Sequence, residues 1–136
     1  MLNAENSLFF LIDIQDRLVG MLKNREEIAK NNSILAKAAK ILGVPVIASE
    51  QYPNGLGSTI LEVREYLNTE NILEKTSFSA LATDTIKAKL ESLNRKKVVL
   101  TGIETHICVY QTARALLDAG FEVYVVKNAC SSRSSK

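Results

Sequence analysis

Short runs of apolar residues, separated by segments with helical periodicity, constrain the fold of this chain most strongly. Residues Ser7–Ile12 form a continuous apolar run, as expected of a strand that is buried on both faces of a sheet. Comparable runs follow at Val44–Ala48, Lys97–Leu100 and Phe121–Val126, and we predict a further short strand at Asn71–Glu74. Strands of this kind are typical of parallel sheets, whose connections place helices on both faces.

The segments between these runs show the spacing of amphipathic helices. Residues 28–42 carry apolar side chains on one helical face, and Gly43 is a natural end for that helix. A second helix is predicted over residues 86–93, and a third from near Cys108 to Gly120. Strands that alternate with helices predict an α/β protein with three layers, α/β/α, around a parallel sheet.

Composition excludes several functional classes. The 136 residues suit one domain, and a hydrophobic content of 46% is enough for a sizeable core. The 17 basic and 15 acidic residues are interspersed and aromatic residues make up only 6%, so we expect no nucleic acid partner. The apolar run near the N-terminus is too short for a membrane span or a signal peptide, so we expect no membrane partner. Two cysteines make no disulfide framework, which predicts a reduced, cytoplasmic protein.

Three chemically reactive side chains follow predicted strands. Asp13 and Lys75 come directly after their strands, and Cys108 stands near the start of the third helix. Each has a structural explanation by itself: a turn residue, a surface lysine and a small buried thiol. Because the carboxyl ends of parallel strands share one edge, we expect all three in one crevice. Backbone N–H groups and the helix dipole at a helix start favour a thiolate, so we expect Cys108 to be acidic.

Three segments, Leu11–Gln15, Glu74–Ser79 and Thr101–Val109, carry a family resemblance when taken together and in this order. The chain resembles the isochorismatase-like cysteine hydrolases, a superfamily that includes nicotinamidases and N-carbamoylsarcosine amidases. Two further segments, Ser49–Gly57 and Asn128–Ser134, look like a subgroup of largely unassigned hydrolases. The resemblance covers nearly the whole chain and implies one hydrolase domain over residues 1–136.

The resemblance also implies a topology. Strand order in the family is 3-2-1-4-5-6, and members continue after the segment at Ser131 with a helix, a sixth strand and a final helix. We therefore expect the order 3-2-1-4-5 here, with the sixth strand missing and the domain incomplete at its C-terminus. The bare edge of the strand at Phe121–Val126 would invite pairing with another chain, and we expect a homo-oligomer.

Catalytic roles are implied by the same resemblance. Cys108 is the expected nucleophile, Asp13 its proton acceptor and Lys75 the third member of the triad. Oxyanion donors are expected at the backbone N–H groups of Glu104 and Cys108, and a cis peptide bond between Ile103 and Glu104. A thiol that attacks a carbonyl needs a base, and a positive lysine keeps that base ionised. We expect hydrolysis of a small amide or related C–N bond through a thioester, with a small-molecule substrate.

Pocket and metal predictions follow from the remaining positions. The candidates for the substrate pocket are Gln15, Tyr52, Leu56, Phe78 and His106. His106 could instead form a Cys–His dyad, although positions i and i+2 of a helix do not face each other. Nicotinamidases bind a metal through an Asp-x-His motif and a further histidine after the second strand. The matching region here, Ser49–Tyr52, holds no histidine, so we expect no metal and no cofactor.

Two alternatives remain open at this level. A non-catalytic, oligomeric binding protein could keep the fold without turnover, since a fold does not fix a function. Vinyl-ether hydrolysis, as in isochorismatases proper, is less favoured because no arginine can be placed in the crevice to clamp a carboxylate. Cys130 follows the last predicted strand, and we expect a small buried residue there.

Overall fold

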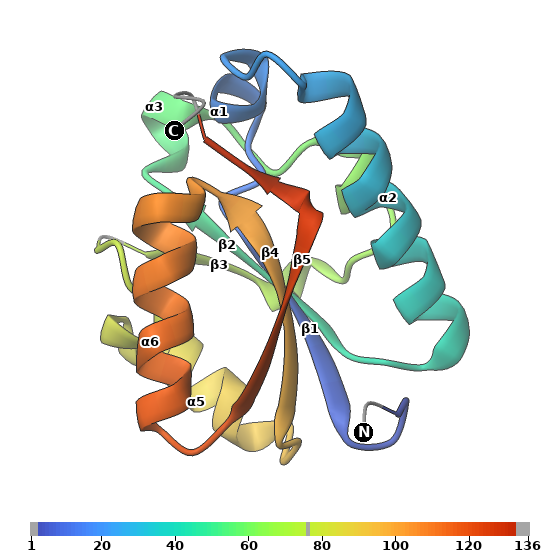
Figure 1. The fold of residues 1–136 in the computed structure, drawn as a ribbon, viewed down its shortest axis with the longest axis vertical. Coiled ribbons are helices and arrows are strands. Elements are labelled where there is room, and N and C mark those ends of the chain that lie inside the picture. The colour runs from blue at the N-terminus through green and yellow to red at the C-terminus, as the bar shows by residue number, and fades with distance from the viewer. Residues whose placement is uncertain (1–2, 76, 133–136) are drawn as a thin grey trace.

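The sheet has the topology that the sequence predicts. The computed structural model describes residues 3–75 and 77–132. Within these residues, five parallel strands form one sheet in the order β3-β2-β1-β4-β5 (Figure 1). Their bounds are Ser7–Ile12 for β1, Val46–Gln51 for β2, Ile72–Lys75 for β3, Lys97–Ile103 for β4 and Glu122–Ser131 for β5. The predicted strand order and parallel pairing are confirmed.

Helices cover both faces of the sheet, which confirms the α/β/α layers (Figure 1). One face is covered by α1 (Asp16–Gly20), α2 (Arg25–Leu42) and α4 (Leu61–Arg64), and the other by α5 (Asp84–Ser92) and α6 (Tyr110–Asp118). Short elements complete the connections: α3 (Pro53–Leu56), the 3₁₀ turns Thr69–Asn71 and Ala80–Ala82, and a π-helical turn at Thr105–Val109. Gly43 ends α2 as expected, in the left-handed conformation.

Strand β1 is the centre of the core because it is buried along its whole length. Alternate side chains of a strand point to opposite faces. Phe9 and Leu11 accordingly pack in the cluster beneath α2, whereas Leu8, Phe10 and Ile12 pack in the cluster beneath α5 and α6. The continuous apolar run in the sequence is therefore the signature of a strand between two helical layers.

Gly102 allows β4 to lie unusually close to β1. It pairs with Ile12 in the parallel ladder and has φ of 151°. A Cβ atom at this position would lie 2.4 Å from the Ile12 carbonyl oxygen. A larger residue would force the two backbones apart. Both strands continue directly into the candidate site, β1 through Asp13 and β4 through Glu104.

Several element bounds differ from the prediction. The segment Ser49–Ser58 is a loop only in its later part, because β2 continues to Gln51 and pairs it with Lys75 of β3. Strand β5 runs from Glu122 to Ser131 and resumes its ladder after a register shift between Leu100 and Gly102. The prediction ended this strand at Val126, where the run of apolar residues ends. The short helices α1, α3 and α4 were not predicted. No helix in the described part of the chain is both long and apolar enough to cross a membrane.

Candidate active site

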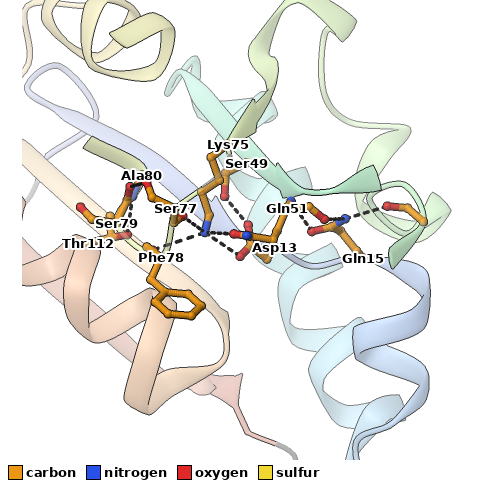
Figure 2. A network of polar contacts seen from close by, with 11 residues as sticks. Asp13, Gln15, Ser49, Gln51, Lys75, Ser77, Phe78, Ser79, Ala80 and Thr112 are labelled. Carbon is orange, nitrogen blue, oxygen red and sulfur yellow. Dashed lines mark hydrogen bonds and ion pairs between the residues drawn. The ribbon is translucent and has the colours of Figure 1, made fainter. Parts of the chain in front are cut away.

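Asp13 stands at the carboxyl end of β1 and is completely buried. Its backbone has φ of 55°, and its N–H donates to the Ser49 carbonyl at 3.1 Å. One carboxylate oxygen, Oδ1, accepts a hydrogen bond from the Ser49 hydroxyl at 2.7 Å. The other, Oδ2, lies 3.0 Å from the Lys75 ammonium (Figure 2). The carboxylate is thus held from two sides by the ends of β2 and β3.

Lys75 ends β3 and is only 2% exposed. Besides Asp13, its ammonium donates to Gln51 Oε1 at 2.7 Å and to the carbonyl oxygens of Ser77 at 2.8 Å and Phe78 at 3.3 Å (Figure 2). A buried ammonium is stable only when its donors find acceptors. The strand end and the segment after it therefore build an oxygen cage for this cation.

Cys108 lies in the π-helical turn between β4 and α6 and is 9% exposed. The peptide bond between Ile103 and Glu104, just before this turn, is cis. The Glu104 carbonyl accepts hydrogen bonds from the N–H groups of Ile107 and Val109, each at 3.1 Å, so the turn wraps around Glu104. The Cys108 sulfur lies close to the Asp13 carboxylate and to the backbone N–H of Glu104. The structure therefore brings Asp13, Lys75 and Cys108 together.

The direction in which the pKa of the Cys108 thiol is shifted differs from the prediction. Burial, followed by the negative charge of Asp13, raises the pKa of the Cys108 thiol, and the positive charge of Lys75 only partly offsets this. The expectation of an acidic thiol is wrong because the sulfur lies in an enclosed site beside a carboxylate. Burial also raises the pKa of the Asp13 carboxyl, while Lys75 and the Ser49 hydroxyl act to lower it. Both groups therefore hold a proton more tightly than an exposed thiol or carboxyl does.

The predicted pocket residues occupy different settings. Gln15 is completely buried, and its amide contacts backbone: it donates to the carbonyls of Gln51 at 3.0 Å and Gly57 at 2.7 Å, and accepts from the Gln51 N–H at 2.7 Å. Tyr52 and Phe78 are 66% and 56% exposed. Leu56 is partly buried against the cluster beneath α2. Gln15 thus shapes the loop after β2, and Tyr52 and Phe78 present rings to solvent.

His106 is exposed, and its Nδ1 lies 2.9 Å from the Ser132 hydroxyl after β5. The same hydroxyl accepts the Thr105 N–H at 3.1 Å. This arrangement gives no support to a Cys–His dyad, because the contact ties the imidazole to the end of β5 instead.

Two further residues belong to the site and were not predicted: Ser49 contacts Asp13, and Gln51 contacts Lys75. Both were assigned to a loop. Ser49, Glu50 and Gln51 are all polar, so no apolar–polar alternation marks this strand end in the sequence. Cys130 is partly buried and pairs with Gly102 in the ladder.

The described residues contain no group of three or more His, Cys, Asp or Glu side chains that could hold a metal ion. The reactive groups gather at the carboxyl edge of a parallel sheet flanked by two helical layers. This combination defines the class of open α/β proteins whose ligand crevice lies at that edge.

The comparison with protein families makes this class specific. The model of the isochorismatase domain matches residues 7–136, and the chain belongs to this family. It is 41% identical to an isochorismatase domain-containing protein 1 of Danio rerio over 133 residues, which cover 98% of this chain and 47% of the relative. It is 36% identical to the secreted isochorismatase effector Isc1 of Phytophthora sojae over 134 residues, covering 96% of this chain and 64% of that protein.

A solved structure of a MAR1 ribonuclease from Caenorhabditis elegans superposes with a TM-score of 0.90 at 39% identity. The match covers 98% of this chain and 69% of that one. The chain thus spans about half the length of the zebrafish relative and about two thirds of the other two proteins. The family resemblance noted from the sequence is confirmed.

Proposed function

We propose that this domain is a cysteine-dependent hydrolase that cleaves a small amide or related C–N bond through a thioester intermediate. The observation that carries the proposal is the juxtaposition of a buried Asp13–Lys75 ion pair with the Cys108 thiol. A buried charge pair is costly to keep, and such pairs gather at functional sites. Membership of the isochorismatase family supports hydrolase chemistry at this site.

Asp13 is the proposed general base and acid. As the Cys108 sulfur attacks the carbonyl carbon, Asp13 takes the thiol proton and the C–S bond forms. The tetrahedral intermediate collapses, the C–N bond breaks, and Asp13 returns the proton to the leaving amine. Asp13 then accepts a proton from water as the water oxygen attacks the thioester carbonyl. The second tetrahedral intermediate collapses, the C–S bond breaks, and Asp13 returns this proton to the sulfur, which releases the carboxylic acid and restores the thiol. The raised pKa of the Asp13 carboxyl suits this exchange, since a base works best when its pKa approaches the operating pH.

Lys75 and the turn before α6 supply the electrostatics of the proposed reaction. The ammonium, 3.0 Å from Asp13, lowers the pKa of the carboxyl and so favours its ionised form against the effect of burial. We assign the oxyanion hole to the backbone N–H groups of Glu104 and Cys108. Loss of one such donor typically costs about 2.7–4 kcal/mol of transition-state stabilisation. The mechanism involves no metal or cofactor, and metal independence is part of the proposal.

Trapping of the thioester tests the proposal. A panel of small amides, carbamoyl compounds and isochorismate is incubated with the protein, acid-quenched and analysed by peptide mass spectrometry. We expect an acyl adduct on the Cys108 peptide, and a loss of turnover by about three orders of magnitude or more in Cys108→Ser. Cys130→Ser is the matched control and should keep full turnover. A Cys108→Ser variant that retains turnover, or binding of panel members without any adduct, would favour isochorismatase-type chemistry or a non-catalytic binding protein.

Ribonuclease activity is a second candidate, favoured by the name of the C. elegans relative at 39% identity. RNA cleavage through the 2′-hydroxyl requires a base but no thiol nucleophile. It would therefore survive Cys108→Ser and be lost in Asp13→Asn. The low net charge of +2 and the scarcity of aromatic residues argue against an RNA-binding surface. A small-molecule substrate, a homo-oligomeric state and a cytoplasmic location belong to the leading proposal.

A further inference from the structure

We propose that Gln51 is a positioning residue, which holds the Lys75 ammonium against Asp13 and keeps its N–H groups turned away from the Cys108 sulfur. The inference rests on the proposed function, because it assigns a task to one residue of that site. Gln51 is the last residue of β2 and faces Lys75 in the ladder with β3. Gln51 is not one of the three predicted catalytic residues.

The first argument is the number of acceptors around Lys75. An ammonium has three N–H donors and no acceptor. Among the described residues, four oxygen atoms lie within 3.3 Å of Lys75 Nζ, and the shortest of these contacts, at 2.7 Å, is to Gln51 Oε1. The three donors are therefore fully used by the carboxylate of Asp13, the amide of Gln51 and backbone carbonyls. Lys75 is left to act on the sulfur through its charge alone.

The electrostatics agree with this arrangement. Lys75 lowers the pKa of the Cys108 thiol through its charge, whereas the hydrogen-bond contributions to that thiol come from Asp13 and Glu104. A lysine turned towards the sulfur would compete with Asp13 for it and would also leave the carboxylate without its counterion. The contact with Gln51 Oε1, at 2.7 Å, holds one N–H of the ammonium and so opposes that rotation.

The second argument is that Gln51 is itself held in place. The buried Gln15 amide accepts the Gln51 N–H at 2.7 Å and donates to the Gln51 carbonyl at 3.0 Å. A further bond from Gln15 to the Gly57 carbonyl, at 2.7 Å, ties the same amide to the following loop. Figure 2 shows the resulting chain of contacts from Gln15 through Gln51 and Lys75 to Asp13. Two backbone bonds fix the start of the Gln51 side chain, so its oxygen is pre-aligned with the ammonium.

Titration of Asp13 tests the proposal without a substrate. The ¹³C chemical shift of the Asp13 carboxyl is followed against pH in the wild type and in Gln51→Met, which has a similar length but no strong acceptor. We expect the Asp13 midpoint to rise by about half a pH unit or more, because a loosened ammonium stabilises the carboxylate less. The pH profile of Cys108 alkylation by iodoacetamide should move in the same direction. Gln111→Met, the same exchange at an exposed position of α6, is the control and should leave both curves unchanged.

The outcomes separate the two proposals. The positioning role is overturned if Gln51→Met folds and its Asp13 titration and Cys108 alkylation profile coincide with those of Gln111→Met. This holds even when a thioester is trapped on Cys108. Absence of the thioester overturns the hydrolase while an altered titration still supports the positioning role. If Gln51→Met does not fold, Gln51→Asn decides, because it keeps an uncharged amide but is one methylene too short to reach Lys75 in the same way. It should raise the Asp13 midpoint, and an unchanged midpoint overturns the proposal.

Discussion

Two of the buried polar networks in the described residues differ in their charge. The site network consists of Asp13, Ser49, Gln51 and Lys75 and contains an ion pair at 3.0 Å. The α2–β5 network is centred on Asn32, whose Nδ2 donates to the carbonyls of Ile28 at 2.9 Å and Ala129 at 3.0 Å. Its Oδ1 accepts the Thr101 hydroxyl at 2.7 Å. Asn32, Thr101 and Asp13 are all completely buried.

The comparison separates structural from functional polarity. The α2–β5 network pairs neutral amide, hydroxyl and carbonyl groups, and it fastens the later half of β5 to α2 at no cost in buried charge. The site network keeps charges where burial opposes them, and an apolar pair would hold the strand ends at least as well. Charges retained at such a place beside a thiol are better explained by chemistry than by stability.

The largest expected effect comes from Lys75→Met. This change removes the cation that lowers the pKa of the Asp13 carboxyl, so that pKa rises further above its ordinary value of 3.8. A folded-state pKa above the unfolded-state value means that the folded chain binds more protons, so stability falls as the pH rises through that interval. We expect the free energy of unfolding to fall by about 3–5 kcal/mol at pH 8 and by less at pH 5, as measured by urea denaturation.

A control for this variant is Asp13→Asn combined with Lys75→Met. Removing both charges should flatten the pH dependence and recover part of the lost stability. If Lys75→Met loses the same free energy of unfolding at pH 5 and at pH 8, the charge of Lys75 does not account for the loss. The site network would then behave like the uncharged α2–β5 network.

Asn32→Leu should have an intermediate effect. It leaves the Ala129 carbonyl and the Thr101 hydroxyl without the partners they have now, which costs about 1–3 kcal/mol of unfolding free energy. Because these groups do not titrate, the loss should be the same at pH 5 and pH 8 in urea denaturation. Thr101→Val added to Asn32→Leu should recover part of it. A strong pH dependence would show that the two networks are coupled.

The smallest effect is expected for His106→Ala. The imidazole is exposed and bound to Ser132, so unfolding free energy should change by less than about 0.5 kcal/mol. The rate of Cys108 alkylation at neutral pH should stay within about twofold of the wild type, since no step of the proposed proton transfer uses His106. A tenfold slower alkylation would instead favour the Cys–His dyad and move this histidine into the site.

The sequence predicted those parts of the molecule in which local pattern and tertiary burial agree. Strand β1 is apolar at every position from Leu8 to Ile12 and is buried on both faces, so its end at Asp13 could be located. The end of β2 could not, because Ser49 and Gln51 are polar and became interpretable only with Asp13 and Lys75 beside them. Local pattern reports which side chains are apolar, and a strand that ends in a polar site breaks that pattern.

The acidity of Cys108 could not be predicted for a related reason. Its place near a helix start is visible in the sequence, but the burial of the sulfur and the nearness of Asp13 are tertiary properties, and they determine the direction of its pKa. Similarly, residues 127–131 lay outside the predicted strand, and their place in β5 is accompanied by contacts with Asn31 and Asn32, nearly a hundred positions earlier.

The absence of a side chain at Gly102 has a practical consequence for redesign. The separation of β1 and β4 is set by the close approach of the Gly102 and Ile12 backbones. Ile12 directly precedes Asp13, and Gly102 lies two residues before Glu104. The distance between the Asp13 carboxylate and the Cys108 turn is then insulated from repacking of the helices on either face. Exposed positions such as Tyr52 and Phe78 can be varied to search for new substrates while the spacing of the reactive groups stays constant.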